Sequence, residues 1–283
     1  MALFKRKANR SQRKLEEILA GAEVPAMSRV VLDILQKLRD PEASMREIAE
    51  MIQWDPGLVT RIFRTVNSSA YGISRPIDDV RHAATFLGRT QLEQLVLGLA
   101  VRDALPKKTA PGFQVQRYWR TAAFRAALAR EIAGKLQPAK QAESFTIGLL
   151  QDMALPLLAS ARPDDYGKVL ETWHEDGTRS LTQIEDDALG WNHAQVGELL
   201  ARKWELPAEM VALIGLHHSS EATDAQVGPA IRLVALLRET EVEHGIDALV
   251  EEAKSGYGLD PDWMRAAVAT CQEKAVELAE ILT

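Results

Sequence analysis

The sequence predicts an all-α protein. Apolar residues recur with the spacing of one helical face from residue 28 to near the C-terminus, and signals that begin or end helices recur along the whole chain. No segment alternates apolar and polar residues as a half-buried strand would. The arrangement we expect is a two-part helical bundle, with an N-terminal five-helix subdomain followed by a larger helical subdomain.

The N-terminal subdomain is expected to span 23–104 and to contain five short helices. The signals that separate them are Asp40-Pro41, a capping box from Ser44 to Glu47, Asp55-Pro56, the turn from Asn67 to Pro76, and a capping box from Thr90 to Glu93. The helix after Pro56 is expected to bury Leu58, Val59, Ile62, Phe63 and Val66. Its outer face would then hold Thr60, Arg61, Arg64 and Thr65.

A segment of low periodicity, 105–116, contains Pro106, Pro111 and Gly112 and is expected to be a linker. The second subdomain is expected to span 117–283. Its predicted helices are 117–136, 141–160, 163–176, 182–189, 193–204, 207–217, 228–243 and 260–282. A capping box from Thr182 to Glu185 is expected to begin the fourth of these helices, and Asp260-Pro261 the last.

The charge is unevenly distributed. The chain has 34 basic and 40 acidic residues, but residues 1–14 hold six basic residues and no acid, so the remainder carries −12. We expect 1–22 to be a flexible basic arm. An acidic body disfavours bulk nucleic-acid binding.

Cys271 is the chain's single cysteine, so an internal disulfide and a metal site made of several cysteines are excluded. We therefore expect a cytoplasmic protein. No apolar run approaches the ~20 residues of a membrane span.

The motifs of several enzyme classes are missing from the sequence. We find no GxGxxG after a strand, no Walker loop, no GxSxG elbow and no HExxH helix. The remaining candidates are Asp152, His193, His217 and His218, since carboxylates and imidazoles are ligands that divalent metals prefer. The alternative is that these residues are structural, with His193 in a first helical turn and the adjacent pair at a helix end.

The helix pair 44–53 and 58–67 suggests another class of protein. Two short amphipathic helices joined by a tight turn are typical of a helix-turn-helix, and Thr60, Arg61, Arg64 and Asn67 would be placed to reach DNA. An exposed face of this composition is equally typical of a solvated helix, and the acidic body would repel DNA.

A series of short motifs, spread in order over residues 24–220, resembles the HDOD domain family. In the N-terminal half they are Val24-Pro25-Ala26-Met27, Asp40-Pro41, Ile48-Ala49, Asp55-Pro56 and Val66 to Gly72. In the second half they are Ile77 to Ala84, Leu87-Gly88, Tyr118-Trp119, Gly148 to Met153, Glu185, Leu189-Gly190, His193 to Gly197, Trp204 to Pro207 and His217-His218.

The resemblance implies an HD-like fold for 117–283, because HDOD domains are helical relatives of the HD and HD-GYP metal-dependent phosphohydrolases. It also implies a degenerate site. Thr121 stands where the enzymes have an early His, Gln151 replaces the His of the His-Asp pair, and the late Asp position falls near Ala235. Asp152, His193, His217 and His218 remain. No catalytic residue, metal or other cofactor is therefore expected, and any divalent metal that did bind would use those four residues.

Our leading hypothesis is a non-catalytic bacterial signal-transduction or regulatory module that acts as a scaffold for a signalling protein partner. Its candidate interaction turn holds Asn67, Tyr71, Gly72 and Arg75. The first alternative is a residual metal-dependent phosphohydrolase acting on nucleotides or cyclic dinucleotides. The second is a helix-turn-helix-like DNA-binding regulator. The sequence leaves homo-oligomerisation open.

Overall fold

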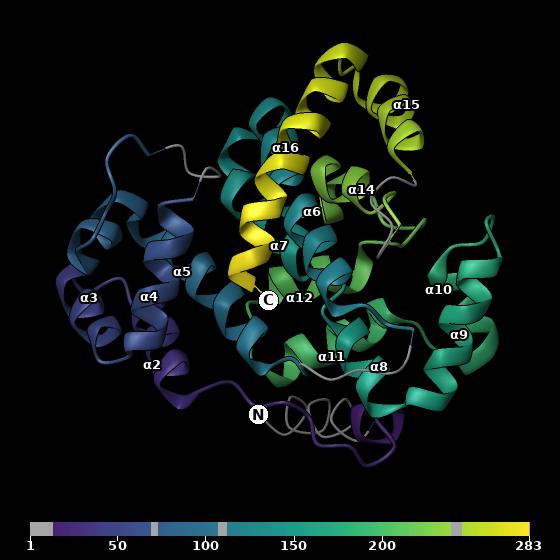
Figure 1. Ribbon diagram of the computed structural model, residues 1–283, viewed down its shortest axis with the longest axis horizontal. Helices are drawn as coiled ribbons and strands as arrows, with labels where there is room; N and C mark the ends of the chain where they lie inside the picture. The colour runs from purple at the N-terminus through teal and green to yellow at the C-terminus, as the bar shows by residue number, and fades with distance from the viewer. Residues whose placement is uncertain (1–13, 69–72, 107–111, 239–244, 283) are drawn as a thin grey trace.

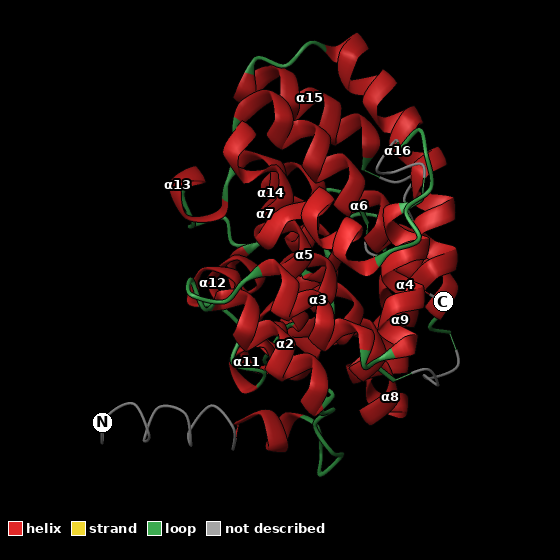
Figure 2. Cartoon of the chain, turned by 90° about the vertical axis from the view of Figure 1, so that its left-hand side faces the viewer, coloured by secondary structure: helices red, strands yellow, loops and turns green. Residues whose placement is uncertain are grey.

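The computed structural model describes residues 14–68, 73–106, 112–238 and 245–282. All regular structure in these ranges is helical, which confirms the predicted fold class (Figures 1 and 2). Tyr71 and Gly72 of the candidate interaction turn lie outside the described residues.

The helices of the N-terminal part are α2 (Arg29–Arg39), α3 (Met45–Gln53), α4 (Pro56–Val66) and α5 (Val80–Ala104). Two predicted start signals are confirmed. Ser44 Oγ accepts a hydrogen bond from Glu47 N–H (3.2 Å), while Glu47 Oε2 accepts one from Ser44 N–H (2.8 Å), which completes a capping box. Asp55 Oδ1 accepts from Leu58 N–H (2.9 Å) at the start of α4.

Two of the expected short helices form α5, which is interrupted by a kink. Gly88 has a φ of +68°, a conformation that glycine adopts without steric cost, and this residue bends the helix. The helix predicted to start at Pro76 begins at Val80, whereas a second helical segment follows the kink at Gly88, close to the start predicted at Thr90. Asp79 caps α5 instead by accepting from His82 N–H (2.8 Å), and Glu93 pairs with Arg39 of α2 at 2.7 Å.

Fewer residues of α4 are exposed to solvent than the sequence predicts. Thr65 is buried, with 1% of its surface exposed, and its hydroxyl donates to Arg61 O (2.8 Å). Arg61 pairs with Asp103 of α5 at 2.8 Å. The prediction that Thr65 points outward was therefore wrong, because α4 packs against α5 along this side.

The second part of the chain contains a 3₁₀ turn, η1, and eleven α-helices among its described residues. They are α6 (Val115–Leu136), η1 (Pro138–Lys140), α7 (Gln141–Leu150), α8 (Ala154–Ala161), α9 (Pro163–Glu175), α10 (Leu181–Leu189), α11 (His193–Lys203), α12 (Ala208–Leu216), α13 (Asp224–Val227), α14 (Pro229–Val234), α15 (Ile246–Tyr257) and α16 (Pro261–Leu282). Asp260 Oδ1 accepts from Trp263 N–H (2.8 Å), which confirms the predicted start of α16.

Several boundaries differ from the prediction. The helix expected at 141–160 is broken at 151–153, and the one expected at 228–243 ends at Val234. The sequence did not predict α13 or α15. The capping box predicted at Thr182 was also wrong, because Ser180 and Gln183 cap α10. This shift of two residues leaves Glu185 free to face the interior.

The core of the second part is built around α6 and α7, which pack face to face near the centre of the molecule, with α14 and α16 against α6 (Figure 1). Helix α5 packs on α7 and so joins the two parts. Cys271 of α16 is fully buried, and burial raises the pKa of its thiol to about 12.

Residues 14–25, which we call the N-terminal strap, pack against the second part before the chain enters α2. Leu15, Ile18 and Leu19 are buried. The Arg162 guanidinium donates to Ile18 O (3.2 Å), and Trp204 Nε1–H donates to Pro25 O (2.7 Å). The described portion of the expected flexible arm is therefore held against the helices.

The stretch 138–161 is long and apolar enough to cross a membrane by length and composition alone. However, 83% of its most apolar window is buried inside the fold. It therefore lies in the protein core, where a run of this composition is needed to fill the space between helices.

Candidate functional site

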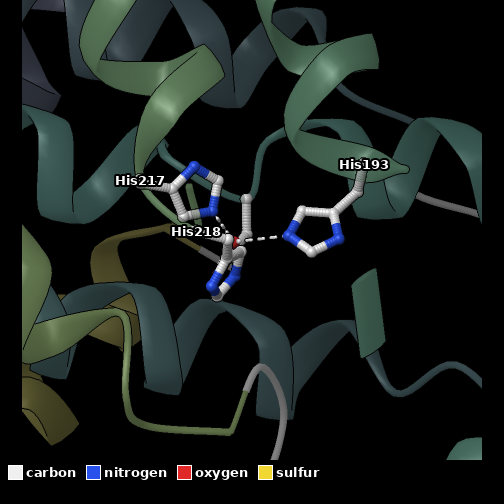
Figure 3. Close-up of side chains that lie close together, drawn as sticks. His193, His217 and His218 are labelled. Carbon is white, nitrogen blue, oxygen red and sulfur yellow. Dashed lines mark hydrogen bonds and ion pairs between the residues drawn. The ribbon is translucent and has the colours of Figure 1, made fainter. Parts of the chain in front are cut away.

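Asp152, His193, His217 and His218 meet in the interior of the second part, and we call them the Asp–His cluster. One potential ligand atom from each lies within 4.8 Å of the others. Figure 3 shows the three imidazoles turned toward a shared centre, with interactions from His193 and His217 ending on one oxygen. The sequence named these four residues, but only the fold brings them together.

The four residues lie at helix ends. Asp152 is in the turn between α7 and α8, where the predicted continuous helix is broken. His193 is the first residue of α11, after Asn192, whose side chain accepts from Gln195 N–H (3.1 Å). His217 follows the last residue of α12, and His218 comes next. These helix ends are held together by the packing of α7, α8, α11 and α12.

Two glycines allow this packing. A Cβ atom on Gly148 of α7 would lie 2.8 Å from Arg125 O of α6, and one on Gly197 of α11 would lie 2.9 Å from Ile214 Cγ2 of α12. Because real Cβ atoms do not approach so closely, each glycine permits a helix crossing that a larger residue would push apart. The crossings place Asp152 beside Arg125 and His193 beside His217.

The imidazoles are oriented by partners on their far sides. Glu185 Oε2 accepts from both Nδ1–H (2.7 Å) and the backbone N–H (2.9 Å) of His193, and Tyr166 O–H donates to Glu185 Oε1. His217 Nδ1–H donates to Ile214 O (2.7 Å). The Nε2 atoms of His193 and His217 then lie 3.3 and 3.1 Å from Asp152 Oδ1. Carboxylate and carbonyl partners of this kind orient histidines in metal sites.

The second oxygen of Asp152 is occupied by a buried cation. Arg125 Nη1 forms an ion pair with Asp152 Oδ2, and both side chains are almost fully buried. The same guanidinium donates from Nε to Val234 O (3.2 Å) and from Nη2 to Leu237 O. These carbonyls flank Ala235, near which the resemblance described above places the late Asp of HD enzymes. Arg125 therefore binds backbone carbonyls of the segment 234–237, which has no carboxylate side chain.

Burial disfavours the charged form of two of the histidines. Burial lowers the pKa of His217 well below its ordinary value, and the nearby His193 lowers it further. Burial also lowers the pKa of His218, with His217 and His193 as further causes. Neutral imidazole is the form that coordinates metals.

The other two residues at degenerate HD positions do not complete a ligand set. Thr121 and Gln151 are buried, and among the described residues the Thr121 hydroxyl and both polar atoms of the Gln151 side chain have no hydrogen-bond partner. Ordered water commonly satisfies such groups. A hydroxyl and an amide are poor substitutes for the imidazoles that a two-metal site requires.

The sequence did not identify Arg125, Tyr166 or Glu185 as parts of this site from chemistry. Glu185 belonged to the HDOD motifs, but the local pattern placed it in a capping box. Arg125 lies among alanines on α6, where a basic residue is usually predicted to lie on the surface. Its position four residues after Thr121 places both side chains on the same helical face, and this spacing could have indicated that Arg125 belongs to the site.

The side chains expected to contact DNA are mostly engaged elsewhere. The Thr60 hydroxyl donates to Pro56 O (2.8 Å), and Arg61 is paired with Asp103. Asn67 clamps the start of the next segment, since its side chain both donates to Ile77 O (2.8 Å) and accepts from Ile77 N–H (2.7 Å). Asn67 therefore holds the turn closed, while Arg64 and Arg75 are exposed.

Comparison with known proteins identifies one family. The HDOD domain model matches residues 24–220. An uncharacterized protein of Treponema pallidum (strain Nichols) is 26% identical over 221 residues, which are 77% of this chain and 42% of that protein. The chain thus spans less than half the length of this relative.

Solved structures share the fold over nearly the whole chain. A protein of Shewanella amazonensis SB2B, provisionally named a phosphohydrolase, aligns over 96% of this chain and 98% of its own with a TM-score of 0.76 and 19% identity. An HDOD domain protein with unknown function from Geobacter sulfurreducens covers 95% of both chains (TM-score 0.73, 24% identity). A protein of Marinobacter aquaeolei VT8, provisionally named for signal transduction, covers 95% of this chain and 61% of its own (TM-score 0.72, 20% identity).

Proposed function

This chain belongs to the HDOD domain family, and from that premise we propose that it is a non-catalytic signal-transduction or regulatory module that binds a protein partner in the bacterial cytoplasm. The observation that carries the proposal is the state of the HD-like site. Asp152, His193 and His217 are each at most 3% exposed, and Asp152 is engaged on both oxygens. These three residues offer a phosphate ester little room, and of the four cluster residues His218 alone is partly exposed.

The missing ligands support the same proposal. Hydrolysis by metal requires an open coordination position for water or substrate. Thr121 and Gln151 do not supply the additional ligands of a two-metal centre, and Arg125 holds one oxygen of the remaining carboxylate. Proteins provisionally named for signal transduction and for phosphate-ester hydrolysis both share the fold, so the fold does not choose between them.

A hydrolysis assay tests the non-catalytic proposal. Protein purified without chelator is incubated with a nucleotide, a cyclic dinucleotide and a generic phosphate ester, each with added Mg²⁺, Mn²⁺ or Zn²⁺. We expect product formation no faster than with the Asp152→Ala variant. Turnover by the wild type that Asp152→Ala abolishes would refute the proposal.

The second candidate, a residual metal-dependent phosphohydrolase, is favoured by the convergence of four ligand atoms within 4.8 Å. The same assay decides it. DNA binding has less support, because Thr60, Arg61 and Asn67 make internal contacts. Salt-dependent duplex binding that weakens in Arg64→Ala would revive it.

Exposed residues of the N-terminal part support a protein partner. Trp54, at the end of α3, is 85% exposed, and an aromatic ring of this size in solvent is typical of an interface residue. Once a partner is captured from the source cytoplasm, its affinity is measured directly. We expect Trp54→Ala to weaken binding at least tenfold and Phe86→Ala, at another exposed aromatic residue, to leave it unaltered. Equal affinities of wild type and Trp54→Ala would exclude this surface.

A further inference from the structure

Helices α9 and α10 pack side by side at the edge of the molecule (Figure 1) and leave a hollow between them, which we call the α9–α10 groove. Its volume is about 320 Å³, and Val169, Ile184 and Leu189 form the apolar part of its lining. Lys168 and Asp187 also line the groove and are exposed to solvent. Since a cavity of about 150 Å³ can hold a benzene ring, the groove has room for an aromatic side chain and a smaller apolar one.

The surface around this groove is acidic. The segment 163–190 has eight acidic and two basic residues, so it carries a net charge of −6. Glu185 is buried, and the other seven acidic residues lie outside the core, which leaves −5 at the surface against Lys168 and Arg179. An apolar groove with this surround favours an occupant that combines apolar and basic side chains.

The segment 1–13 of the same chain has this chemistry. It contains five basic residues and no acidic one, so its charge of +5 balances the −5 around the groove. Leu3 and Phe4 come directly before the first of the basic residues, which are Lys5, Arg6, Lys7, Arg10 and Arg13. The segment therefore offers both the apolar side chains and the opposite charge.

The N-terminal strap passes the end of the groove. Arg162 Nη1 donates to Ile18 O of the strap (3.2 Å), and Nε of the same guanidinium donates to Asp165 Oδ2 (3.0 Å), which lines the groove. Ten residues from Phe4 to Lys14 span about 15 Å as a helix or roughly 33 Å when extended. The part of α9 that lines the groove, from Asp165 to Thr172, is only about 10 Å long, so the segment has the length to reach along it.

We propose that residues 1–13 dock on the α9–α10 groove of their own chain, with Leu3 and Phe4 in the apolar hollow and the basic side chains against the acidic surround. Contacts between exposed charges are individually weak. However, a short tether gives an effective concentration on the order of millimolar, which favours this segment over that of a second copy.

Such docking would control access to the groove. A partner that presents a basic, amphipathic segment could bind here only by displacing residues 1–13, so the segment would act as a built-in competitor. The inference goes beyond the proposed function and does not depend on it.

Zero-length cross-linking of the full chain tests the inference. A carbodiimide joins a lysine amine to a carboxylate in contact with it, forming an amide with loss of water. Mixing unlabelled with ¹⁵N-labelled protein separates links within one chain from links between two. At low ionic strength we expect Lys5 and Lys7 to link to acidic residues of 163–190 within one chain. The yield should fall several-fold at about 1 M salt, where the Debye length is about 3 Å.

Variants of the full chain provide the comparison. Phe4→Ser keeps every reactive amine and carboxylate and should lower the yield of these links several-fold, because it removes the apolar contact. Reversing the charges of Glu171 and Glu175, which lie three residues after Lys168 and Thr172 on α9, should do the same for links to the remaining acidic residues. The matched control is charge reversal at the exposed Glu251 and Glu252 of α15, which should leave the yield unaltered.

Three results would overturn the inference. They are links from Lys5 and Lys7 spread evenly over other acidic surfaces, links between labelled and unlabelled chains only, and a yield that Phe4→Ser does not change. Each would leave the proposed function standing, whereas phosphohydrolase activity would refute that function and leave the docking intact.

Discussion

Arg125 shows how one side chain can determine the character of a site. Its guanidinium is buried, pairs with Asp152 and donates to the carbonyls of Val234 and Leu237 at the end of α14. A buried charge is tolerated only when it is paired and its hydrogen bonds are satisfied. Arg125 therefore both neutralises the carboxylate and connects α6 to α14.

Replacing Arg125 with Met should destabilise the protein by about 3–5 kcal/mol, because the Asp152 carboxylate would be left buried without its counter-ion. Chemical denaturation of stripped protein, in the presence of chelator, measures the change. The matched control is Arg265→Met, whose pair with Asp247 (3.2 Å) is exposed and should contribute little. Equal effects at the two positions would contradict this interpretation of the buried pair.

Substitution of Tyr166 tests how much the hydrogen bond to Glu185, the carboxylate that orients His193, contributes to stability. Its hydroxyl donates to the buried Glu185 carboxylate, and hydrogen bonds to charged groups contribute about 1.5–3 kcal/mol. Tyr166→Phe should lower the free energy of unfolding by this amount. Tyr257→Phe removes a comparable bond to Asp224 (3.0 Å) at the surface and should cost less than about 1 kcal/mol. Denaturant titrations of both variants give the comparison, and a larger loss at Tyr257 would be inconsistent with it.

At the scale of single elements, the breaks in helices matter more than the helices themselves. The predicted helix 141–160 would have run straight through Asp152, whereas the turn at 151–153 directs this carboxylate into the bundle. Apolar periodicity cannot reveal such a break, because α7 and α8 are buried on nearly every side and so lack a clear amphipathic pattern. The capping prediction at Thr182 failed for a related reason, since the residues from 180 to 185 contain two overlapping sets of capping side chains.

Gly148 tests the crossing of α6 and α7. Its added Cβ would meet backbone atoms of Arg125 at 2.8 Å, so Gly148→Ala should cost about 1–3 kcal/mol by forcing the helices apart. Gly167→Ala on α9, where an added Cβ meets nothing within 4 Å, should stabilise by up to about 1 kcal/mol through helix propensity. The two thermal unfolding curves should therefore shift in opposite directions, and a stable Gly148→Ala would show that the crossing is not tight.

At the scale of the whole molecule, the N-terminal strap joins two parts that the sequence treats as separate. It packs Leu15 and Leu19 into the core and reaches Arg162 and Trp204 of the second part. Leu19→Ala should cost about 2–5 kcal/mol. Leu236→Ala, at a side chain that is 41% exposed, should cost less than about 1.5 kcal/mol. Denaturation monitored by circular dichroism measures both, and a minor effect at Leu19 would show that the strap is dispensable.

The sequence was sufficient for the helical class and for the names of the four cluster residues, because helix periodicity is local and the HDOD motifs are ordered along the chain. It could not show that Asp152, His193 and His217 converge, since this depends on helix crossings at Gly148 and Gly197. It also missed Arg125, whose function is defined by partners about 110 positions away, at Val234 and Leu237.

The buried thiol on α16 can serve as a probe of transient opening of the fold. Cys271 is the chain's single cysteine, it is fully covered, and its raised pKa keeps it protonated at neutral pH. A thiol reagent should therefore react when an opening of the fold, such as separation of α16 from α6, exposes this residue. The rate at which Cys271 is labelled under native conditions would measure how often these openings occur. A lower rate in the presence of partner or metal would show that binding suppresses them.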